Sequence, residues 1–455
     1  MPDADLPRAT AREVIALLTG AAGFTEHRPP PSPLPPDGPL GWAGYDAARE
    51  RASARTGEEE SVVYGTGAVG DRACVLLSFE FGFLGGSLGR QTGDRLAAAY
   101  ELALTRRIPL VALVATGGSR MQEGMIALTQ LQRVAAASVR LRAAGLPQIA
   151  VVRDPTTGGG WATVGAGADV VLALPGAQVG FAGSRVRPPD ADPYAYSAEG
   201  QFAAGQVDAV VPADELSATV THWLRALGPH GDLPPAPVPR ALSVADSGPV
   251  APLPETGREA VARARDPRRP RAEAYLADYF AVRLPLHGDR SGSTDPGLLC
   301  GLGLRGDGQP VAYVAQCGTP TRPAGYRAAA RTIRLADRLG VPVLTLVDTP
   351  GAANDADAER AGAGAAIADT FAAVAAARVP VTTLVIGEGG SGGALALASP
   401  DNTHVTVDSY FSVIAPEPAA AILKRPPSET GATADQLRLR PQDLVDLGFA
   451  RSIVG

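Results

Sequence analysis

Short apolar runs alternate with amphipathic stretches along most of the chain. The run IPLVALVAT at 108–116 is typical of a buried strand, and GDRLAAAYELALTRR at 93–107 has the periodicity of a helix. The same order returns at 328–349, where AAARTIRLADRLG precedes VPVLTLVDT. Strands that alternate with helices predict parallel strands joined by right-handed crossovers, and therefore an α/β fold.

A two-stranded segment precedes each of these stretches. VVYGTGAVGDRACVLLSF at 62–79 and LLCGLGLRGDGQPVAYVAQC at 298–317 each read as two strands around a glycine-containing turn. Because both segments stand at the same place in their half, they are the first sign that the chain repeats one unit.

The spacing of prolines and glycines strengthens the repeat. Two prolines stand 38 residues apart in each half: Pro109 and Pro147, then Pro342 and Pro380. A glycine pair follows 12 and 13 residues after the second proline: Gly159 and Gly160, then Gly392 and Gly393. We therefore interpret the chain as a tandem duplication of one α/β unit.

The expected domain boundaries follow from changes in composition. Residues 1–60 form an N-terminal segment with a helix-like stretch, AREVIALLTG, and a proline-rich loop. The first α/β domain is expected at 61–228 and the second at 257–455. Between them, 229–256 is rich in proline and small residues, which is typical of a semi-rigid linker.

Composition excludes several classes of protein. The formal net charge is -6, so a nucleic-acid partner is not expected. An arginine cluster at 263–271 is interpreted as a solvated face or linker edge rather than an anion site. No leader peptide or membrane-length apolar run is visible, and the three cysteines lack metal-site spacing. We expect a cytoplasmic protein without a metal.

Four glycine-rich turns are the candidate chemistry. Each half has two, and helix-forming sequence follows each: Gly117-Gly118, Gly158–Gly160, Pro350-Gly351 and Gly389–Gly393. The first N–H groups of a helix lack internal partners, and glycine lets a ligand approach them. Two converging N–H groups make an oxyanion hole. The alternative is that these glycines serve only tight turns or close packing.

Other catalytic signatures are missing from the sequence. It has no GxxxxGK[ST] phosphate loop, no GxSxG elbow, no Cys–His signature and no metal-ligand cluster. Two holes suit a reaction in which two oxyanions develop, without a side-chain nucleophile.

Nine motifs carry a family resemblance. Those of the first half are FEFGFLGGSLG (79–89), TGGSRMQEG (116–124), DPTTGGG (154–160) and VGFAGSRV (179–186). Those of the second half are DPRRPRAEAYL (266–276), HGDR (287–290), DTPGA (348–352), GEGGSGGALA (387–396) and YFSVIAPEPAAAILK (410–424). With these motifs the first half resembles the beta subunit of bacterial acetyl-CoA carboxylase carboxyltransferase, and the second half resembles the alpha subunit, roughly over 60–215 and 260–455.

The resemblance implies a fold and a reaction. The fold is α/β with two tandem crotonase-like (ββα-spiral) domains. The reaction moves a carboxyl group from carboxybiotin to a short acyl-CoA, with acetyl-CoA to malonyl-CoA as the first guess. In this family Gly159 and Gly160 would hold the thioester oxygen, and Gly393 and Ala394 the biotin ureido oxygen. Other expected substrate-binding residues are Gly117, Gly118, Gly351, Gly392 and Trp161.

Partners follow from the same resemblance and from what the chain lacks. Its only lysine, Lys424, is not in a biotinyl MKM motif, and no ATP-binding loop is present. The carboxylated biotin must then come on a separate biotin carboxyl carrier protein, charged by a separate biotin carboxylase. The family active site lies between two protomers, so a homodimer or higher homo-oligomer is expected.

Two other functions stay open at this point. One is a biotin-independent decarboxylase of a malonyl thioester that uses only the first hole. The other is a non-catalytic scaffold subunit of a carboxylase.

Some residues depart from the family pattern. The beta subunit's four-cysteine zinc ribbon is missing, so no zinc is expected, and DTPGAAND replaces DTPGAYPG. Trp161 stands where the family has a small residue; it could reshape the acyl pocket or turn into the core. His287, in HGDR, is expected to be structural, and His404 has no recognisable role.

Overall fold

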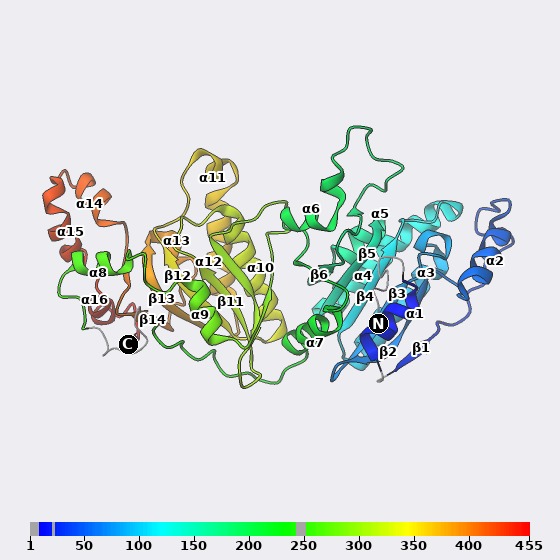
Figure 1. The fold of residues 1–455 in the computed structure, drawn as a ribbon, viewed down its shortest axis with the longest axis horizontal. Helices are drawn as coiled ribbons and strands as arrows, with labels where there is room; N and C mark the ends of the chain where they lie inside the picture. Colours follow the sequence, from blue (N-terminus) through cyan, green and yellow to red (C-terminus); the bar gives the residue numbers. More distant parts are fainter. Residues whose placement is uncertain (1–8, 21–22, 243–251) are drawn as a thin grey trace. The chain divides into compact units, whose positions relative to one another are not determined.

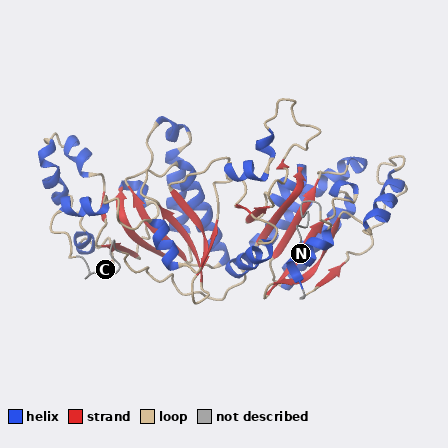
Figure 2. Cartoon of the chain, viewed as in Figure 1, coloured by secondary structure: helices blue, strands red, loops and turns tan. Residues whose placement is uncertain are grey.

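The computed structural model describes residues 9–20, 23–242 and 252–455 (Figure 1). The chain divides into two compact units, Met1–Pro229 and His230–Gly455. Figure 2 shows the same composition in each unit, a sheet accompanied by helices. In the described residues, no helix combines the length and the apolar character that crossing a membrane requires.

Unit 1 is built on one eight-stranded sheet in the order β1-β2-β3-β4-β5-β6-β8, with β7 paired to β5. The β1–β2 and β2–β3 pairs are antiparallel, and every pair from β3 onward is parallel. The strands are β1 (Phe24–His27), β2 (Val62–Val69), β3 (Arg72–Phe79), β4 (Leu110–Thr116), β5 (Gln148–Thr157), β6 (Val170–Ala173), β7 (Val179–Gly180) and β8 (Ala209–Val210).

The helices of unit 1 connect these strands. They are α1 (Ala11–Thr19), α2 (Tyr45–Thr56), α3 (Arg90–Arg106), α4 (Gly124–Ala143), α5 (Gly158–Gly160), α6 (Ala198–Ala203) and α7 (Leu216–Leu227). Short 3-10 turns are η3 (Leu84–Gly86), η4 (Met121–Glu123) and η6 (Pro193–Tyr196), and η5 (Trp161–Gly165) is π-helical. The helix predicted from AREVIALLTG is confirmed as α1, with Thr10 as its N-cap.

Unit 2 repeats this plan. Its eight-stranded sheet has the order β16-β14-β13-β12-β11-β10-β9, with β15 paired to β13. The strands are β9 (Val282–Pro285), β10 (Leu298–Leu304), β11 (Pro310–Gln316), β12 (Val343–Thr349), β13 (Val381–Gly390), β14 (Thr403–Thr406), β15 (Tyr410–Ser412) and β16 (Ser452–Val454). The β9–β10 and β10–β11 pairs are antiparallel, and the other pairs are parallel.

The helices of unit 2 include two long ones, α10 (Pro323–Leu339) and α12 (Ala363–Ala376), which pack against each other. The others are α8 (Gly257–Ala264), α9 (Ala272–Tyr279), α11 (Ala356–Arg360), α13 (Ser391–Leu395), α14 (Pro416–Ile422), α15 (Thr430–Gln436), α16 (Pro441–Asp446) and the 3-10 turn η7 (Pro427–Glu429). The predicted pair of two-stranded segments and the parallel strands after them are confirmed in both units.

The core explains why the central strands are apolar throughout. Every residue of β4 and of β12 is buried. In unit 1 the buried face of the sheet packs against α3 and α4 through side chains such as Leu96 and Val134. A parallel strand covered on both faces has no solvent side, so its sequence is continuously hydrophobic rather than alternating.

The predicted linker is only partly described. Ala236 is buried in the core cluster of unit 2, and its carbonyl accepts a hydrogen bond from Thr382 Oγ1 at 2.8 Å. Residues 243–251 lie outside the described residues. The domain boundaries proposed from composition stay a prediction.

Candidate active site

Two glycine turns meet in unit 1, at the carboxyl ends of the parallel strands β4 and β5. Gly117 and Gly118 follow β4, and Gly158 opens the short helix α5 after β5. A Cβ built on Gly158 would lie 3.0 Å from the Cα of Gly118. Gly118 and Gly158 also have positive φ angles, +105° and +64°. The two turns therefore touch backbone to backbone, which a side chain on Gly158 would prevent.

Gly159 and Gly160 continue this turn and are both buried. A Cβ on Gly160 would lie 2.4 Å from Cγ2 of Thr116, and one on Gly159 would lie 2.5 Å from the tip of Leu131. At Gly160 the short Thr116 side chain leaves no room for a Cβ, whereas at Gly159 the flexible end of Leu131 would have to move aside. The N–H groups of both glycines belong to the first turn of a helix, where donors have no intrahelical partner.

Trp161 follows the glycine triplet and opens the π-helical turn η5. Its carbonyl accepts a hydrogen bond from the Ala166 N–H at 2.7 Å, five residues on. The ring packs in a core cluster with Val152 and Val179, and the side chain is 7% exposed. A Cβ on Gly165 would lie 2.6 Å from the Trp161 ring. Of the two orientations that the sequence left open, the structure shows the one in the core.

Unit 2 has the corresponding pair of turns after β12 and β13. Gly351, with φ +143°, follows β12. Gly390 ends β13, and a Cβ there would lie 2.1 Å from the carbonyl oxygen of Pro350. Ser391 then begins α13 with φ +58°, a left-handed conformation that is uncommon outside glycine. As in unit 1, the two turns are in direct backbone contact.

Gly393 and Ala394 are the third and fourth residues of α13, and both are buried. A Cβ on Gly393 would lie 2.4 Å from the backbone N of Ala352 and 3.0 Å from the carbonyl carbon of Gly351. Gly392 differs, because no atom of the described residues lies within 4 Å of a Cβ built there. The structure thus brings Gly351 and Gly393 together and leaves the Gly392 side open.

Arg120 stands two residues after Gly118, and its side chain lies in a buried network of polar groups. Its Nη2 donates to Glu60 Oε1 at 2.5 Å and to the Ser87 carbonyl at 2.7 Å. Its Nη1 donates to Glu60 Oε2 at 2.9 Å and to the Tyr45 hydroxyl at 3.1 Å, while Tyr45 donates to Glu123 at 2.5 Å. Both Arg120 and Glu60 are buried, so their charges depend on each other and on these additional hydrogen bonds.

Acid is expected to weaken unit 1 through Glu60. Burial by itself raises the pKa of this carboxyl, but the charge and hydrogen bonds of Arg120 lower it to about 2 from an ordinary 4.5. A folded-state pKa below the unfolded value contributes stability above pH 4.5 and loses it as the pH falls toward 2. Urea unfolding at several pH values should show a steeper loss below pH 4.5 for wild type than for Glu60→Gln.

The neighbouring Glu59 provides the control, since its side chain is 61% exposed. Glu59→Gln should keep the steep acid dependence of the wild type. Parallel curves for wild type and Glu60→Gln would show that the buried pair does not cause it.

Arg269 and Asp348 form a similar buried ion pair in unit 2. Arg269 Nη2 donates to Asp348 Oδ1 at 2.5 Å, and its other nitrogens donate to three backbone carbonyls. Asp348 also accepts from Arg271 Nη1 and from the Glu388 N–H, both at 3.1 Å. Asp348 stands near the end of β12 and Glu388 near the end of β13, so this carboxylate ties together the two strand ends that carry the turns.

The arginine cluster therefore needs a correction. Interpretation as a solvated face is wrong for Arg269, which is 4% exposed, although it holds for Arg268, whose side chain is 75% exposed. Charge spacing along the sequence could not separate them, because the partner of Arg269 lies 79 residues further along the chain.

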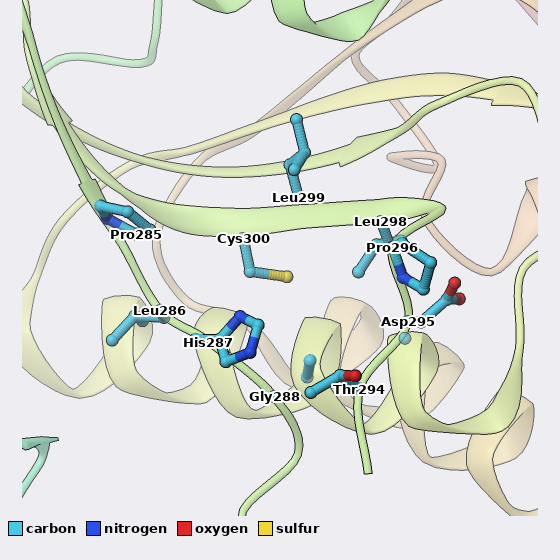
Figure 3. Close-up of a pocket in the computed structure, with 12 residues that line it drawn as sticks. Pro285, Leu286, His287, Gly288, Thr294, Asp295, Pro296, Leu298, Leu299 and Cys300 are labelled. Atoms are coloured by element: carbon cyan, nitrogen blue, oxygen red, sulfur yellow. The ribbon is translucent and has the colours of Figure 1, made fainter. Parts of the chain in front are cut away.

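His287 lies in unit 2 beside a cavity of about 180 Å³ (Figure 3). Asp295 and Cys300 also line it, and none of its twelve lining residues belongs to a glycine turn. Asp295 accepts hydrogen bonds from the N–H groups of Arg322 and Gly297 at 2.7 and 2.8 Å. Burial raises the pKa of Cys300 to about 12, so this thiol stays protonated at neutral pH and is no nucleophile.

His404 lies on β14 and belongs to none of the four glycine turns. Its ring nitrogens are 2.8 Å from Ser452 Oγ and 3.2 Å from Asn402 Oδ1, and burial lowers its pKa. In the part of the chain that the structure describes, no three His, Cys, Asp or Glu residues gather into a ligand set for a metal. The donors at the four turns are backbone groups.

Comparison with known proteins identifies the family. The model "Carboxyl transferase domain" matches residues 41–210, and "Acetyl co-enzyme A carboxylase carboxyltransferase-like" matches 254–455. The acetyl-CoA carboxylase carboxyl transferase subunits beta/alpha of Saccharopolyspora erythraea is 39% identical over 452 residues, which is 95% of this chain and 75% of the relative. The chain belongs to the acetyl-CoA carboxylase carboxyltransferase family.

Other relatives of this carboxyltransferase agree. The beta/alpha protein of Salinispora arenicola is 38% identical over 98% of this chain and 82% of its own length. The probable biotin-dependent acyl-CoA carboxylase beta3 subunit of Mycobacterium bovis is 34% identical over 90% of this chain and 82% of its own length. The predicted family and enzyme class, an acyl-CoA carboxylase carboxyltransferase, are confirmed.

Solved structures show the same fold for the carboxyltransferase. Transcarboxylase 12S, crystallised with methylmalonyl-CoA and methylmalonic acid, matches with a TM-score of 0.75 at 21% identity, over 98% of this chain and 87% of that one. A single-chain long-chain acyl-CoA carboxylase matches with a TM-score of 0.76 at 21% identity, over 99% of this chain and 45% of that one. The predicted fold class, α/β with two tandem crotonase-like domains, is confirmed.

Proposed function

We propose that the chain transfers a carboxyl group from carboxybiotin, held on a separate carrier protein, to a short acyl-CoA, with acetyl-CoA as the first candidate. The observation that carries this proposal is the duplicated pair of glycine turns, each pair in backbone contact at the carboxyl ends of two parallel strands. Two sets of backbone donors suit a reaction with two developing oxyanions.

In the first unit, the N–H groups of Gly159 and Gly160 would hold the thioester oxygen as negative charge develops on it. Gly117 and Gly118 complete this pocket. Trp161 contributes indirectly, because its ring packs in the core and supports the turn that carries the two donors. Donors fixed by the fold stabilise the enolate more than the neutral thioester, which raises the rate.

In the second unit, the N–H groups of Gly393 and Ala394 would hold the ureido oxygen, with Gly351 and Gly392 beside it. Carboxybiotin, as the carboxyl donor, would supply carbon dioxide and, once the carboxyl group has left, a ureido base for the proton of the acyl α-carbon. The chain's own residues thus contribute donors and orientation. The narrow space at Gly393 supports this assignment, because only a residue without a side chain leaves the position next to Ala352 N open.

The partners in this proposal are a biotin carboxyl carrier protein, a biotin carboxylase and a second copy of the chain. The carboxyltransferase domains would be 61–228 and 257–455. The names of the relatives support the reaction class and differ in the acyl group, because one is called an acetyl-CoA carboxylase component and another an acyl-CoA carboxylase subunit.

The test combines the purified chain with carboxylated carrier protein and a panel of acetyl-, propionyl- and butyryl-CoA. We expect the corresponding malonyl-type thioester, detected by mass spectrometry, with one acyl-CoA preferred. Absence of product with every acyl-CoA would contradict the proposal. Release of carbon dioxide from malonyl-CoA without any biotin species would instead indicate a decarboxylase, and carrier binding without turnover would indicate a scaffold.

A further inference from the structure

The carbonyl of Gly393 is held by two buried side chains from outside its own helix. Tyr326 Oη, on α10, donates to this oxygen at 2.9 Å, and Gln316 Nε2, at the end of β11, donates at 3.3 Å. Tyr326 is 1% exposed and Gln316 is fully buried. Gln316 Nε2 also donates to Thr321 Oγ1 at 3.1 Å, which fixes the orientation of its amide.

Through the geometry of the peptide bond, these two hydrogen bonds also affect the N–H of Ala394. The carbonyl of Gly393 and the N–H of Ala394 belong to one planar trans peptide, so they point in opposite directions. Holding the oxygen toward α10 therefore sets the direction of the N–H. A donor on the oxygen also polarises the peptide and strengthens the N–H as a donor in turn.

The Tyr326 hydroxyl is suited to this task because it keeps its proton and its place. Burial raises the pKa of Tyr326 above its ordinary value, so the hydroxyl remains a donor over the working pH range. The ring packs against Ala366 and Ala396 in a small core cluster. The backbone carbonyl of Tyr326 accepts a hydrogen bond from Thr370 Oγ1 at 2.9 Å, which ties α10 to α12.

Unit 1 has a comparable contact, made by a different residue and one position earlier in the repeat, where Gly159 corresponds to Gly392. Thr163 Oγ1 donates to the carbonyl of Gly159 at 2.7 Å. That carbonyl shares its peptide with the N–H of Gly160. In both units, therefore, a hydroxyl holds the oxygen of the peptide whose N–H is the second proposed donor.

We propose that Tyr326 and Thr163 are positioning residues whose hydroxyls set the direction and the donor strength of the Ala394 and Gly160 N–H groups. This inference rests on the proposed function, since it deepens the two oxyanion holes. Gln316 assists Tyr326 in unit 2. A purely structural role, in which the hydroxyls only satisfy two buried carbonyls, would leave the chemistry untouched.

The test removes each hydroxyl with little other change, in Tyr326→Phe and Thr163→Val. The assays are transfer from carboxylated carrier to acetyl-CoA, or to whichever acyl-CoA the wild type prefers, and the reverse transfer from its product to free biotin. We expect kcat to fall about 10-fold in each variant, part of the loss expected when an oxyanion donor is removed. KM for the acyl-CoA should change less than twofold, because the interaction strengthens only in the transition state.

Controls separate positioning from general loss of structure. Thr163→Ser keeps the hydroxyl and should keep at least half of kcat. Tyr275→Phe removes a buried tyrosine hydroxyl that accepts from the Leu242 N–H at 3.1 Å, at no glycine turn. It should lower the melting temperature about as much as Tyr326→Phe and leave kcat unchanged.

Two results would overturn the inference, and both differ from failure of the proposed function. Full kcat in Tyr326→Phe and Thr163→Val would do so, and so would an equal fall of kcat in Tyr275→Phe. The proposed function fails separately, if wild type itself makes no carboxylated thioester with any acyl-CoA.

Discussion

Gly393→Ala is expected to lower kcat for carboxyl transfer by at least about 100-fold, the loss typical of removing one oxyanion donor. The added Cβ would lie 2.4 Å from the backbone N of Ala352 and 2.7 Å from the Tyr326 hydroxyl. Ala352 N is a backbone atom and Tyr326 is a buried ring with little room to move, so the turn itself must shift. The peptide between Gly393 and Ala394 then rotates away from the direction that Tyr326 sets.

The measurement is steady-state transfer from carboxylated carrier, with thermal unfolding recorded alongside. Gly364→Ala is the matched control, because Gly364 is an exposed residue of α12 and its Cβ would meet no atom within 4 Å in the described part of the chain. That variant should be fully active and slightly more stable, as alanine is the better helix former. Normal turnover in Gly393→Ala would show that this turn does not hold the ureido oxygen.

Arg269→Met is expected to destabilise unit 2 by about 3–5 kcal/mol, the usual cost of removing one partner from a buried ion pair. The variant leaves Asp348, which is fully buried, with Arg271 as its remaining charged partner. Three backbone carbonyls also lose this donor. Since Asp348 ties β12 to β13, activity should fall together with stability.

Arg268→Met is the control for this change. Arg268 is the preceding residue, pairs with the nearby Asp266 and has a side chain that is 75% exposed, so its loss should leave the stability nearly unchanged. Urea unfolding monitored by circular dichroism gives both values. Equal stability of the two variants would contradict a structural role for the buried pair.

Much of the fold could be predicted because it depends on short-range patterns. The apolar runs of β4 and β12 can be recognised within a short window of sequence. The same is true of the helical periodicity that precedes each run. The positions of the glycine turns followed from the repeated 38-residue spacing in the sequence. The structure brings Gly118 next to Gly158 and Gly351 next to Gly393, as neighbouring parallel strands require.

The residues behind the turns could not be predicted in the same way. Arg120 and Arg269 stand inside motifs of the family, but Glu60 and Asp348, with which they form buried ion pairs, lie 60 and 79 residues away in sequence. Tyr326 reaches Gly393 across 67 residues. Such pairs depend on how helices and strands pack against each other. The spacing of residues within one motif does not predict that packing.

The side chain of Trp161 shows a second limit. The sequence allowed it to face either the acyl pocket or the core. A π-helical turn carries one more residue than an α-helical turn, and this changes the direction of every side chain in it. The Ala166 N–H to Trp161 carbonyl bond that makes this turn is a property of the folded backbone.

Thr163 and Tyr326 lie at very different sequence distances from the carbonyls that they hold. This difference predicts the order in which the two glycine turns form during folding. Thr163 lies four residues from the carbonyl that it holds, so this bond closes as soon as its own helix forms. Tyr326 lies 67 residues from Gly393 and reaches it only when α10 has docked on the sheet of unit 2. Contacts of long sequence separation carry a larger loop-closure cost and form late in folding. During refolding, the glycine turn of the first unit should therefore form before that of the second. The last step before the chain is active is the docking of α10.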